Sequence, residues 1–358
     1  MTTQFDKQRQ EKEMGLRTID DIHELMAAPR QAAVLIAALE LGLFWRLKDR
    51  PLSSAVIAQE MKIPPRRCHH WLRLLATMNL LEQEGDHFGL SPLARAAILD
   101  IHTQEAWKLL AIDAAENLED SLFLAQHLRD ANPEKDSAGQ FRYQLDPYVQ
   151  KMEADLDRAR LFSQTLYELH TPLAQDVAAA LEVNGARSLM DVGGGSGVVS
   201  LALLRKHPEL KATVVDIANV CIAGREIADK LPEQDRISYY PANFVEDELP
   251  KGFDIVLKCD VSIFDDTILA KLAGSLNEGG RLVIVDRWFD MGEKETARRL
   301  AFVLSKSLRN PEYSLRSLED IGAGLTKAGL TVEPIVELPY GSWKMIQARK
   351  GVSSLPKP

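Results

Sequence analysis

The sequence predicts an α/β fold in which a mostly helical region with a winged helix precedes a parallel, Rossmann-like sheet. Before residue 186, apolar residues recur at helical spacing and one short hairpin pattern interrupts them. From residue 186 onward, short apolar runs closed by a polar residue alternate with helical patterns, as in a sheet whose strands are joined by helices. We therefore expect three segments: a helical and winged-helix domain at 1–105, a helical connector at 106–185 and the α/β domain at 186–350.

Length and composition limit the class of protein. With 358 residues and 46% hydrophobic content, the chain is long enough for two domains with buried cores. A net charge of −9 argues against nucleic acid as the main partner, because phosphate backbones attract basic surfaces.

The cysteines and the apolar runs predict where the protein works. Cys68, Cys221 and Cys259 are widely spaced, which indicates a reducing, cytoplasmic setting. The most apolar run, residues 32–43, contains Glu40 and is too short to cross a bilayer, so we expect no membrane partner. We also expect no metal, because no His and Cys cluster has metal-ligand spacing.

Three helical patterns and a hairpin predict the first domain. Residues 33–39 form a dense apolar helix that stops near Gly42. A preceding serine is a cap for a helix over 55–61, and a further helix follows over 66–78. Residues 80–90 contain two short apolar runs around a Gly-Asp turn, which completes a winged helix.

The winged helix carries basic residues that leave a DNA-binding alternative open. Arg66, Arg67 and Arg73 fall on the helix that would enter a DNA groove. The acidic chain and the attached α/β domain favour a structural role for this helix. The alternative is a winged-helix regulator that senses a metabolite through its α/β domain.

The connector is predicted to be helical over 104–131 and 147–181, around a polar loop at 132–140. The α/β domain follows, with strands expected at 188–190, 211–216, 236–240, 254–258, 281–285, 330–336 and 343–348, and a helix at 315–328. Ligands bind beyond the carboxyl ends of the strands in such a sheet. The residues expected to gather there are Gly193, Asp216, Asn243, Lys258 and Asp286.

Residues 191–197, DVGGGSG, form a strand, glycine turn and helix start. Gly193, Gly195 and Gly197 stand at alternate positions, so the backbone can pass close to a ligand, and the helix start offers free N–H groups. A nucleotide-like ligand is predicted. The dinucleotide fingerprint requires a small residue five places after the first glycine, and Val198 occupies that place, which disfavours NAD.

An acidic residue closes the second predicted strand. Asp216 lies 25 residues after Asp191, and its carboxylate is suited to accept both hydroxyls of a ribose. This spacing supports adenosine binding in general and does not choose the cofactor. A lone Asp or Asn at a strand end also has a structural reading, as a turn or cap residue.

With these residues placed, residues 22–349 resemble the plant and bacterial small-molecule O-methyltransferases, which are class I S-adenosylmethionine (SAM) dependent enzymes. The resemblance implies a homodimer formed by the N-terminal domain, SAM in the α/β sheet and a small-molecule acceptor between them. Six apolar or aromatic side chains are candidates to line the acceptor pocket, although side chains of this kind also pack in cores. They are Trp288, Phe289, Met291, Tyr148, Met152 and Phe162. The cofactor-binding positions that the resemblance implies are Asp191, Gly193, Gly195, Asp216, Asn243, Phe244 and Lys258.

The catalytic residues depart from the family pattern. Most family members place a histidine, the general base, in the segment after the Lys258 strand, and here Ser262 takes its place. A serine cannot usefully accept a proton near neutral pH. The remaining ionisable candidates are Asp286 and Asp260, which end or follow strands on the ligand edge.

The expected function is SAM-dependent methylation of a small aromatic or conjugated metabolite, on oxygen or carbon. Orientation of reactants can supply about 7–11 kcal/mol of the barrier, whereas a general base contributes about 10²–10⁴-fold in rate. We therefore expect catalysis mainly by proximity and orientation. The alternatives are the DNA-binding regulator and a SAM-binding relative that does not methylate.

Overall fold

The computed structural model describes residues 16–129, 148–287, 297–308, 316–340 and 343–352. The chain divides into two compact units, Met1–Phe123 and Leu124–Pro358. This boundary falls inside the predicted connector at 106–185, whose helices are therefore shared between the units. Among the described residues, no helix is both long and apolar enough to span a membrane.

The first unit is a helical domain with a winged helix, as predicted. Its small sheet has the strand order β1-β3-β2 with antiparallel pairs. Thr18 caps the first described helix in a capping box with Asp21, and buried Phe44 and Phe88 lie in its core. The elements are α2 (Ile19–Glu40), α3 (Leu43–Arg46), β1 (Leu52–Ser53), α4 (Ser54–Glu60), α5 (Pro65–Thr77), β2 (Leu81–Glu84), β3 (His87–Leu90), α6 (Pro92–Ala94), the π-helix Arg95–Leu99 and α7 (Gln104–Ser121).

The second unit is built on an eight-stranded sheet with the order β10-β11-β8-β7-β4-β5-β6, and β9 also pairs with β11. Its strands are β4 (Ser188–Val192), β5 (Lys211–Asp216), β6 (Ile237–Pro241), β7 (Phe253–Cys259), β8 (Leu276–Arg287), β9 (Leu330–Val332), β10 (Val336–Glu337) and β11 (Trp343–Lys350). Its helices are α8 (Leu124–His127), α9 (Tyr148–Ala154), α10 (Leu156–Ala180), α11 (Val198–Lys206), α12 (Ala218–Ala228), the 3₁₀ turn Gln234–Arg236, α13 (Asp266–Gly274), α14 (Ala297–Ser307) and α15 (Leu318–Lys327).

The prediction of a wholly parallel sheet is wrong at one edge. The five strands from β6 to β8 are parallel, but β11 runs antiparallel to β8, and β9 and β10 run antiparallel to β11. The sheet is therefore mixed. Apolar runs predict where strands lie but carry no information about their direction, which depends on the connections between them.

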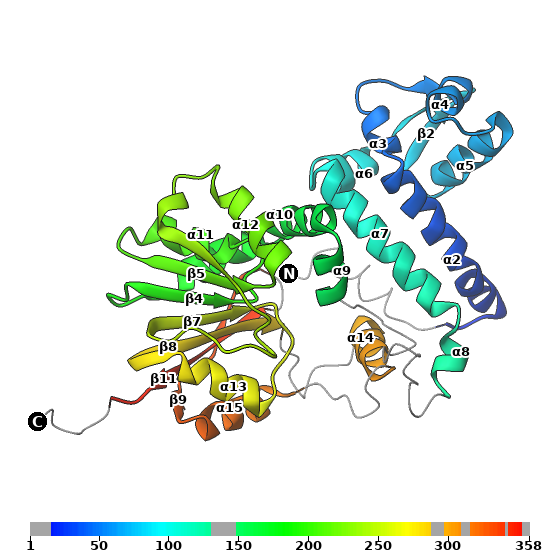
Figure 1. The fold of residues 1–358 in the computed structure, drawn as a ribbon. Helices are drawn as coiled ribbons and strands as arrows, with labels where there is room; N and C mark the ends of the chain where they lie inside the picture. Colours follow the sequence, from blue (N-terminus) through cyan, green and yellow to red (C-terminus); the bar gives the residue numbers. More distant parts are fainter. Residues whose placement is uncertain (1–15, 130–147, 288–296, 309–315, 341–342, 353–358) are drawn as a thin grey trace, which may run out of the picture. The chain divides into compact units, whose positions relative to one another are not determined.

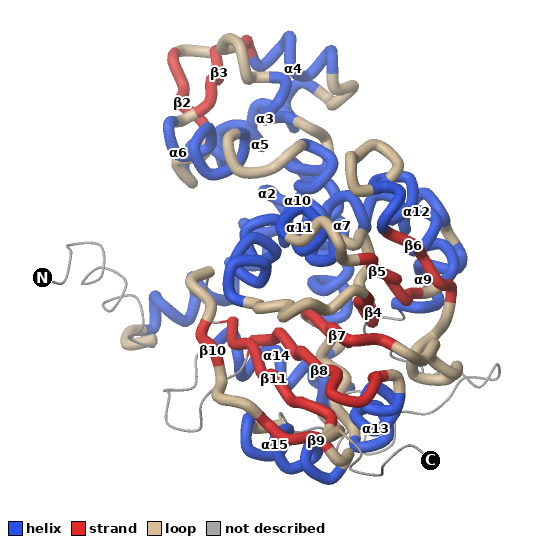
Figure 2. The backbone as a smooth tube through the Cα atoms, turned by 90° about the vertical axis from the view of Figure 1, so that its left-hand side faces the viewer, coloured by secondary structure: helices blue, strands red, loops and turns tan. Residues whose placement is uncertain are grey.

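The central strands are buried on both faces, which explains their continuous apolar sequences. Along β4, Leu189 packs in a cluster with Leu173 of α10 and Leu201 of α11, whereas Met190 packs in a second cluster with Leu269 of α13. Helices α10 and α11 cover one face, and α13 and α15 cover the other (Figures 1 and 2). The sheet is thus a fixed layer from which the strand ends project.

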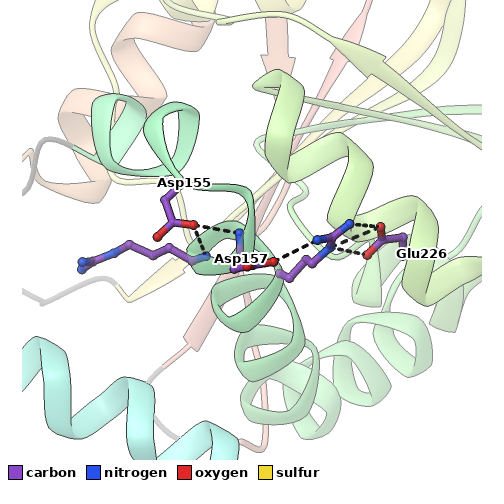
Figure 3. A network of polar contacts seen from close by, with 5 residues as sticks. Asp155, Asp157 and Glu226 are labelled. Carbon is purple, nitrogen blue, oxygen red and sulfur yellow. Dashed lines mark hydrogen bonds and ion pairs between the residues drawn. The ribbon is translucent and has the colours of Figure 1, made fainter.

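Polar contacts fasten α9 and α10 to α12. Asp155 caps α10 by accepting the backbone N–H of Asp157 at 2.9 Å. Arg160 on α10 contacts both carboxylate oxygens of Glu226 on α12 and also Asp157 (Figure 3). Asn219 of α12 donates to two backbone carbonyls in the last turn of α9, at 2.9 and 3.0 Å. Helix α12, which begins two residues after Asp216, is thereby held against its neighbours.

Replacement of Gly224 should loosen this packing. A Cβ atom there would lie 2.6 Å from the carbonyl oxygen of Gly195 and 2.4 Å from the ring of Tyr239, so Gly224→Ala should lower the free energy of unfolding by about 1–3 kcal/mol. Gly322→Ala is the matched control, because its Cβ would meet nothing within 4 Å and alanine favours a helix. Urea denaturation measures both, and equal effects of the two substitutions would contradict the tight approach of α12.

Candidate active site

Parallel alignment brings several predicted site residues to one edge of the sheet. β4 lies between β5 and β7, and β8 follows β7, so the carboxyl ends of these four strands are neighbours. Charge interactions link Asp191 to Asp216, and Lys258 to both Asp286 and Asp260, across this edge. Of the residues predicted to gather at the strand ends, Asp216, Lys258 and Asp286 lie at the ends of β5, β7 and β8.

The glycine turn follows β4 and is packed closely on two sides. Gly193, Gly195 and Gly197 have φ angles of +69°, +53° and +74°, in the left-handed region that glycine favours. A Cβ on Gly193 would lie 2.7 Å from Val261, and one on Gly197 would lie 2.7 Å from the hydroxyl of Tyr239. At Gly195 the nearest atom would be a carboxylate oxygen at 4.0 Å, so open space lies beside this residue.

Asp216 ends β5 and faces the open side of the turn. Its Oδ2 accepts the N–H of Gly195 at 3.0 Å, and its Oδ1 accepts the N–H of Ile217 at 2.8 Å. Burial raises the pKa of Asp216 to about 6, although both hydrogen bonds oppose the rise. Each carboxylate oxygen keeps a lone pair, so the group can still accept hydroxyl donors from a ligand.

Asp191 lies beneath the turn. It is buried, and its Oδ2 accepts the hydroxyl of Ser200 at 2.7 Å. A Cβ on Gly194 would come within 2.5 Å of its carboxyl carbon, so the carboxyl group supports the turn from below. Its Oδ1 is buried without a hydrogen-bond partner among the described residues, and burial raises the pKa of Asp191 to about 7. The predicted contact of Asp191 with the cofactor stays a prediction.

Asn243 and Phe244 follow β6, beside Asp216. The side-chain oxygen of Asn243 accepts the N–H of Val245 at 3.2 Å, and its backbone N–H donates to Asp247 at 2.8 Å. These bonds form a turn, which is the structural role that the sequence also allows for an Asn at a strand end. The ring of Phe244 packs against the second core cluster. The adenine contacts predicted for the two residues stay predictions.

Lys258 is fully buried in β7. Its Nζ donates to the carbonyl oxygen of Val261 and lies 3.7 Å from the centre of the Phe264 ring. Burial lowers the pKa of Lys258, and the nearby carboxylate of Asp286 opposes this shift. The side chain therefore holds the segment after β7 in place. Its predicted contact with the cofactor stays a prediction.

The predicted catalytic carboxyl groups differ in exposure. Asp286 is buried at the end of β8, accepts the N–H of Arg287 at 2.7 Å, and has a pKa raised by burial. Its Oδ2 is buried without a hydrogen-bond partner among the described residues. Asp260 is 34% exposed, and Ser262 is exposed in the segment that Lys258 fastens.

The structure adds a histidine that sequence reasoning missed. His170 of α10 lies with its Nε2 2.9 Å from Oδ2 of Asp260. The two residues are 90 positions apart in the chain, so local spacing gave no sign of the pair. The only available signal was a histidine in the helix predicted over residues 147–181.

Three of the predicted acceptor-pocket residues form a small cluster near the same edge. The other three, Trp288, Phe289 and Met291, lie outside the described residues. Met152 is buried with Ile217 and Val220, and Tyr148 and Phe162 pack against them with ring centres 5.3 Å apart. Ile217 directly follows Asp216, so this cluster adjoins the ribose-binding candidate. Its predicted role in an acceptor pocket stays a prediction.

The residues at the edge fit an adenosyl cofactor. Open space at Gly195 and a carboxylate that can accept two hydroxyls are the features that such a ligand uses. Sequence models give the family. The O-methyltransferase domain model matches residues 126–331, more than half of the chain, and the O-methyltransferase dimerisation domain model matches residues 23–99.

The chain belongs to the O-methyltransferase family. This methyltransferase is 26% identical over 321 residues to the tetracenomycin polyketide synthesis 8-O-methyl transferase TcmO of Streptomyces glaucescens, covering 87% of this chain and 91% of that protein. It is 29% identical over 262 residues to the 3-hydroxy-5-methyl-1-naphthoate 3-O-methyltransferase of Streptomyces sahachiroi, covering 72% and 73%. A solved structure described as PigF with SAH has the same fold, with a TM-score of 0.80 at 20% identity, covering 93% of this chain and 100% of that chain. The cofactor of this methyltransferase is SAM.

Replacement of Asp216 should weaken cofactor binding. The Asp216→Asn methyltransferase loses the charge and one acceptor facing the open space at Gly195, so its affinity for S-adenosylhomocysteine (SAH) should fall about 10- to 100-fold. Asp229→Asn is the control, because it removes a carboxylate that pairs with Arg225 at the far end of α12 from Asp216. Calorimetric titration measures both, and an unchanged affinity in Asp216→Asn would remove this residue from the ribose site.

The buried carboxyl of Asp191 should make stability depend on pH. Its folded-state pKa of about 7 is above the unfolded value, so the folded chain keeps a proton that the unfolded chain has lost. This contribution to stability is full below about pH 4 and is lost as pH rises to about 7. Asp191→Asn cannot ionise, so its stability relative to the unaltered chain should increase over this range by a few kcal/mol, on the order of 1.4 for each pKa unit. A constant difference in urea denaturation from pH 5 to pH 8 would contradict this placement of Asp191.

Proposed function

We propose that the chain transfers a methyl group from SAM to a hydroxyl oxygen of a small aromatic metabolite. The single observation that carries this proposal is the match of the O-methyltransferase domain model over residues 126–331, which contain the glycine turn and Asp216. The names of the two Streptomyces relatives, which describe methylation of a polyketide and of a hydroxynaphthoate, support an aromatic acceptor. The dimerisation-domain match supports a homodimer. We propose that the protein acts in the cytoplasm.

The residues of the chain would contribute binding, orientation and exclusion of water. Gly195 and Asp216 would hold the ribose end of the cofactor, which supplies an electrophilic methyl group when bound. The acceptor would be held in line with that methyl group at the ends of β4 and β7. Because well-oriented reactants recover about 7–11 kcal/mol of the barrier, orientation is the largest contribution that this site can make.

The catalytic candidates from the sequence have different parts in this proposal. Asp286 is buried and accepts the backbone N–H of Arg287, so it stabilises the end of β8 and the positive charge of Lys258. Asp260 is partly exposed beside the segment that contacts the glycine turn, and it is the carboxylate we place nearer the acceptor. Ser262 has no part in proton transfer, because a hydroxyl does not accept a proton near neutral pH.

Transfer of labelled methyl groups tests the function. The purified chain, incubated with methyl-labelled SAM and a panel of hydroxynaphthoates and hydroxyanthraquinones, should give methyl ethers and SAH. Ser262→Ala should keep turnover within about threefold, because only positioning depends on that side chain. Methyl label found on a ring carbon would show C-methylation and contradict the proposed O-methylation. A loss of turnover by several orders of magnitude in Ser262→Ala would show that Ser262 acts on the acceptor.

A further inference from the structure

The His170–Asp260 pair joins a helix to a strand end at the reaction edge. Nε2 of His170 lies 2.9 Å from Oδ2 of Asp260, and the side chains are 17% and 34% exposed. His170 belongs to α10, whose following turns are packed into the main core through Leu173 and Val177. The imidazole is therefore carried by a rigid element, and it retains access to solvent at an otherwise packed edge.

The backbone at Asp260 is shaped to make this contact. Asp260 has a φ of +55°, a left-handed conformation that few residues other than glycine adopt, and its N–H donates to the carbonyl of Val285 on β8 at 2.9 Å. Such conformations persist where the surroundings impose them, and they concentrate at functional sites. The next residue, Val261, lies against Gly193 of the glycine turn. Asp260 is therefore followed directly by the residue whose side chain lies against this turn.

The hydrogen bond fixes which nitrogen of His170 is free. A carboxylate has acceptor oxygens only, so Nε2 must donate its hydrogen to Asp260. In the neutral ring Nδ1 then carries a lone pair, and no described residue hydrogen-bonds to it. A histidine held by a carboxylate through one nitrogen and open at the other has the arrangement of a general base.

The surroundings of the ring are aromatic and of mixed charge. Trp343 of β11 stands edge to face with His170, with ring centres 6.2 Å apart, and the guanidinium of Arg287 lies 4.6 Å from the centre of the Trp343 ring. The charged groups that face the pair from the strand ends are Arg287 and Asp286 of β8 and Lys258 of β7. These aromatic and charged side chains favour a flat acceptor with a weakly acidic hydroxyl group.

We propose that His170, oriented by Asp260, is the general base that accepts the hydroxyl proton of the acceptor. The acceptor oxygen forms a bond to the methyl carbon, the bond from that carbon to sulfur breaks with its electron pair left on sulfur, and the hydroxyl proton moves to Nδ1 of His170. Asp260 stabilises the resulting imidazolium, and the proton passes to water after product leaves. This inference rests on the proposed O-methylation and names its base, which Ser262 does not supply.

Acceptors of different acidity test the role of His170. With 2-naphthol as acceptor, His170→Gln should lower kcat about 10²–10⁴-fold and leave the affinity for SAH unchanged. With a nitro-substituted naphthol that is already ionised at neutral pH, the same variant should lose less than about tenfold, because no proton remains to be removed. Equal losses for both acceptors, or no loss for 2-naphthol, would overturn the proposal.

Asp260→Asn tests the orienting carboxylate, since asparagine tolerates the left-handed backbone. It should lower kcat for 2-naphthol about 10- to 100-fold with little change in KM. His87→Gln is the matched control, because His87 forms an exposed pair with Asp86 at 2.8 Å within the first unit and its replacement should leave kcat unchanged.

A measurement that needs no turnover separates this inference from the proposed function. Nitrogen-15 NMR of the SAH complex, with the His170 signals identified by their loss in His170→Gln, should show the proton of the neutral ring on Nε2. A proton on Nδ1 would overturn the pair as a base, whatever the activity. No methyl transfer to any acceptor by the unaltered chain, with the proton on Nε2, would overturn the base role together with the proposed function and leave only the hydrogen-bonded pair.

Discussion

The hydrogen bond from the N–H of Gly195 to the carboxylate of Asp216 is the interaction on which the site depends. It joins the turn after β4 to the end of β5, and it exists because parallel pairing sets the two strands in register. Beneath it, Asp191 supports the turn, and above it space remains at Gly195. Burial raises the pKa of both carboxyl groups, and the charge of Asp216 raises that of Asp191 further. A bound ribose and a cationic sulfonium would relieve the cost of charging these groups.

The sequence predicted the fold and the strand ends more completely than the side-chain contacts. Apolar runs located the strands, and the glycine turn located the ligand edge. They could not show that β11 runs antiparallel to β8, because strand direction depends on the path of the chain between them. Nor could they show that Asp191 accepts the hydroxyl of Ser200, or that the amide oxygen of Asn243 accepts a backbone N–H of its own turn. Those hydrogen bonds depend on which donors the folded chain brings next to each group.

His170 shows the same limit more sharply. The histidine expected after Lys258 is absent from the sequence, and a reading confined to that segment leaves no base. The residue that the structure brings there comes from a helix 90 positions earlier. Three features of the structure place His170 beside Asp260. They are the packing of α10 on the sheet, the left-handed backbone of Asp260, and the hydrogen bond from the Asp260 N–H to Val285. None of these features is visible in residue spacing.

A base carried by α10 differs physically from one carried by the segment after β7. That segment is fastened by Lys258, whose ammonium group is buried against Val261 and Phe264, whereas Ser262 within it is exposed. A helix packed into the core holds a side chain more rigidly than an exposed residue of a loop, and rigid placement is what makes orientation effective. In this arrangement Asp260 is the only part of the pair on the loop, and its backbone is held by β8. Positioning and proton transfer then depend on the same packed layer.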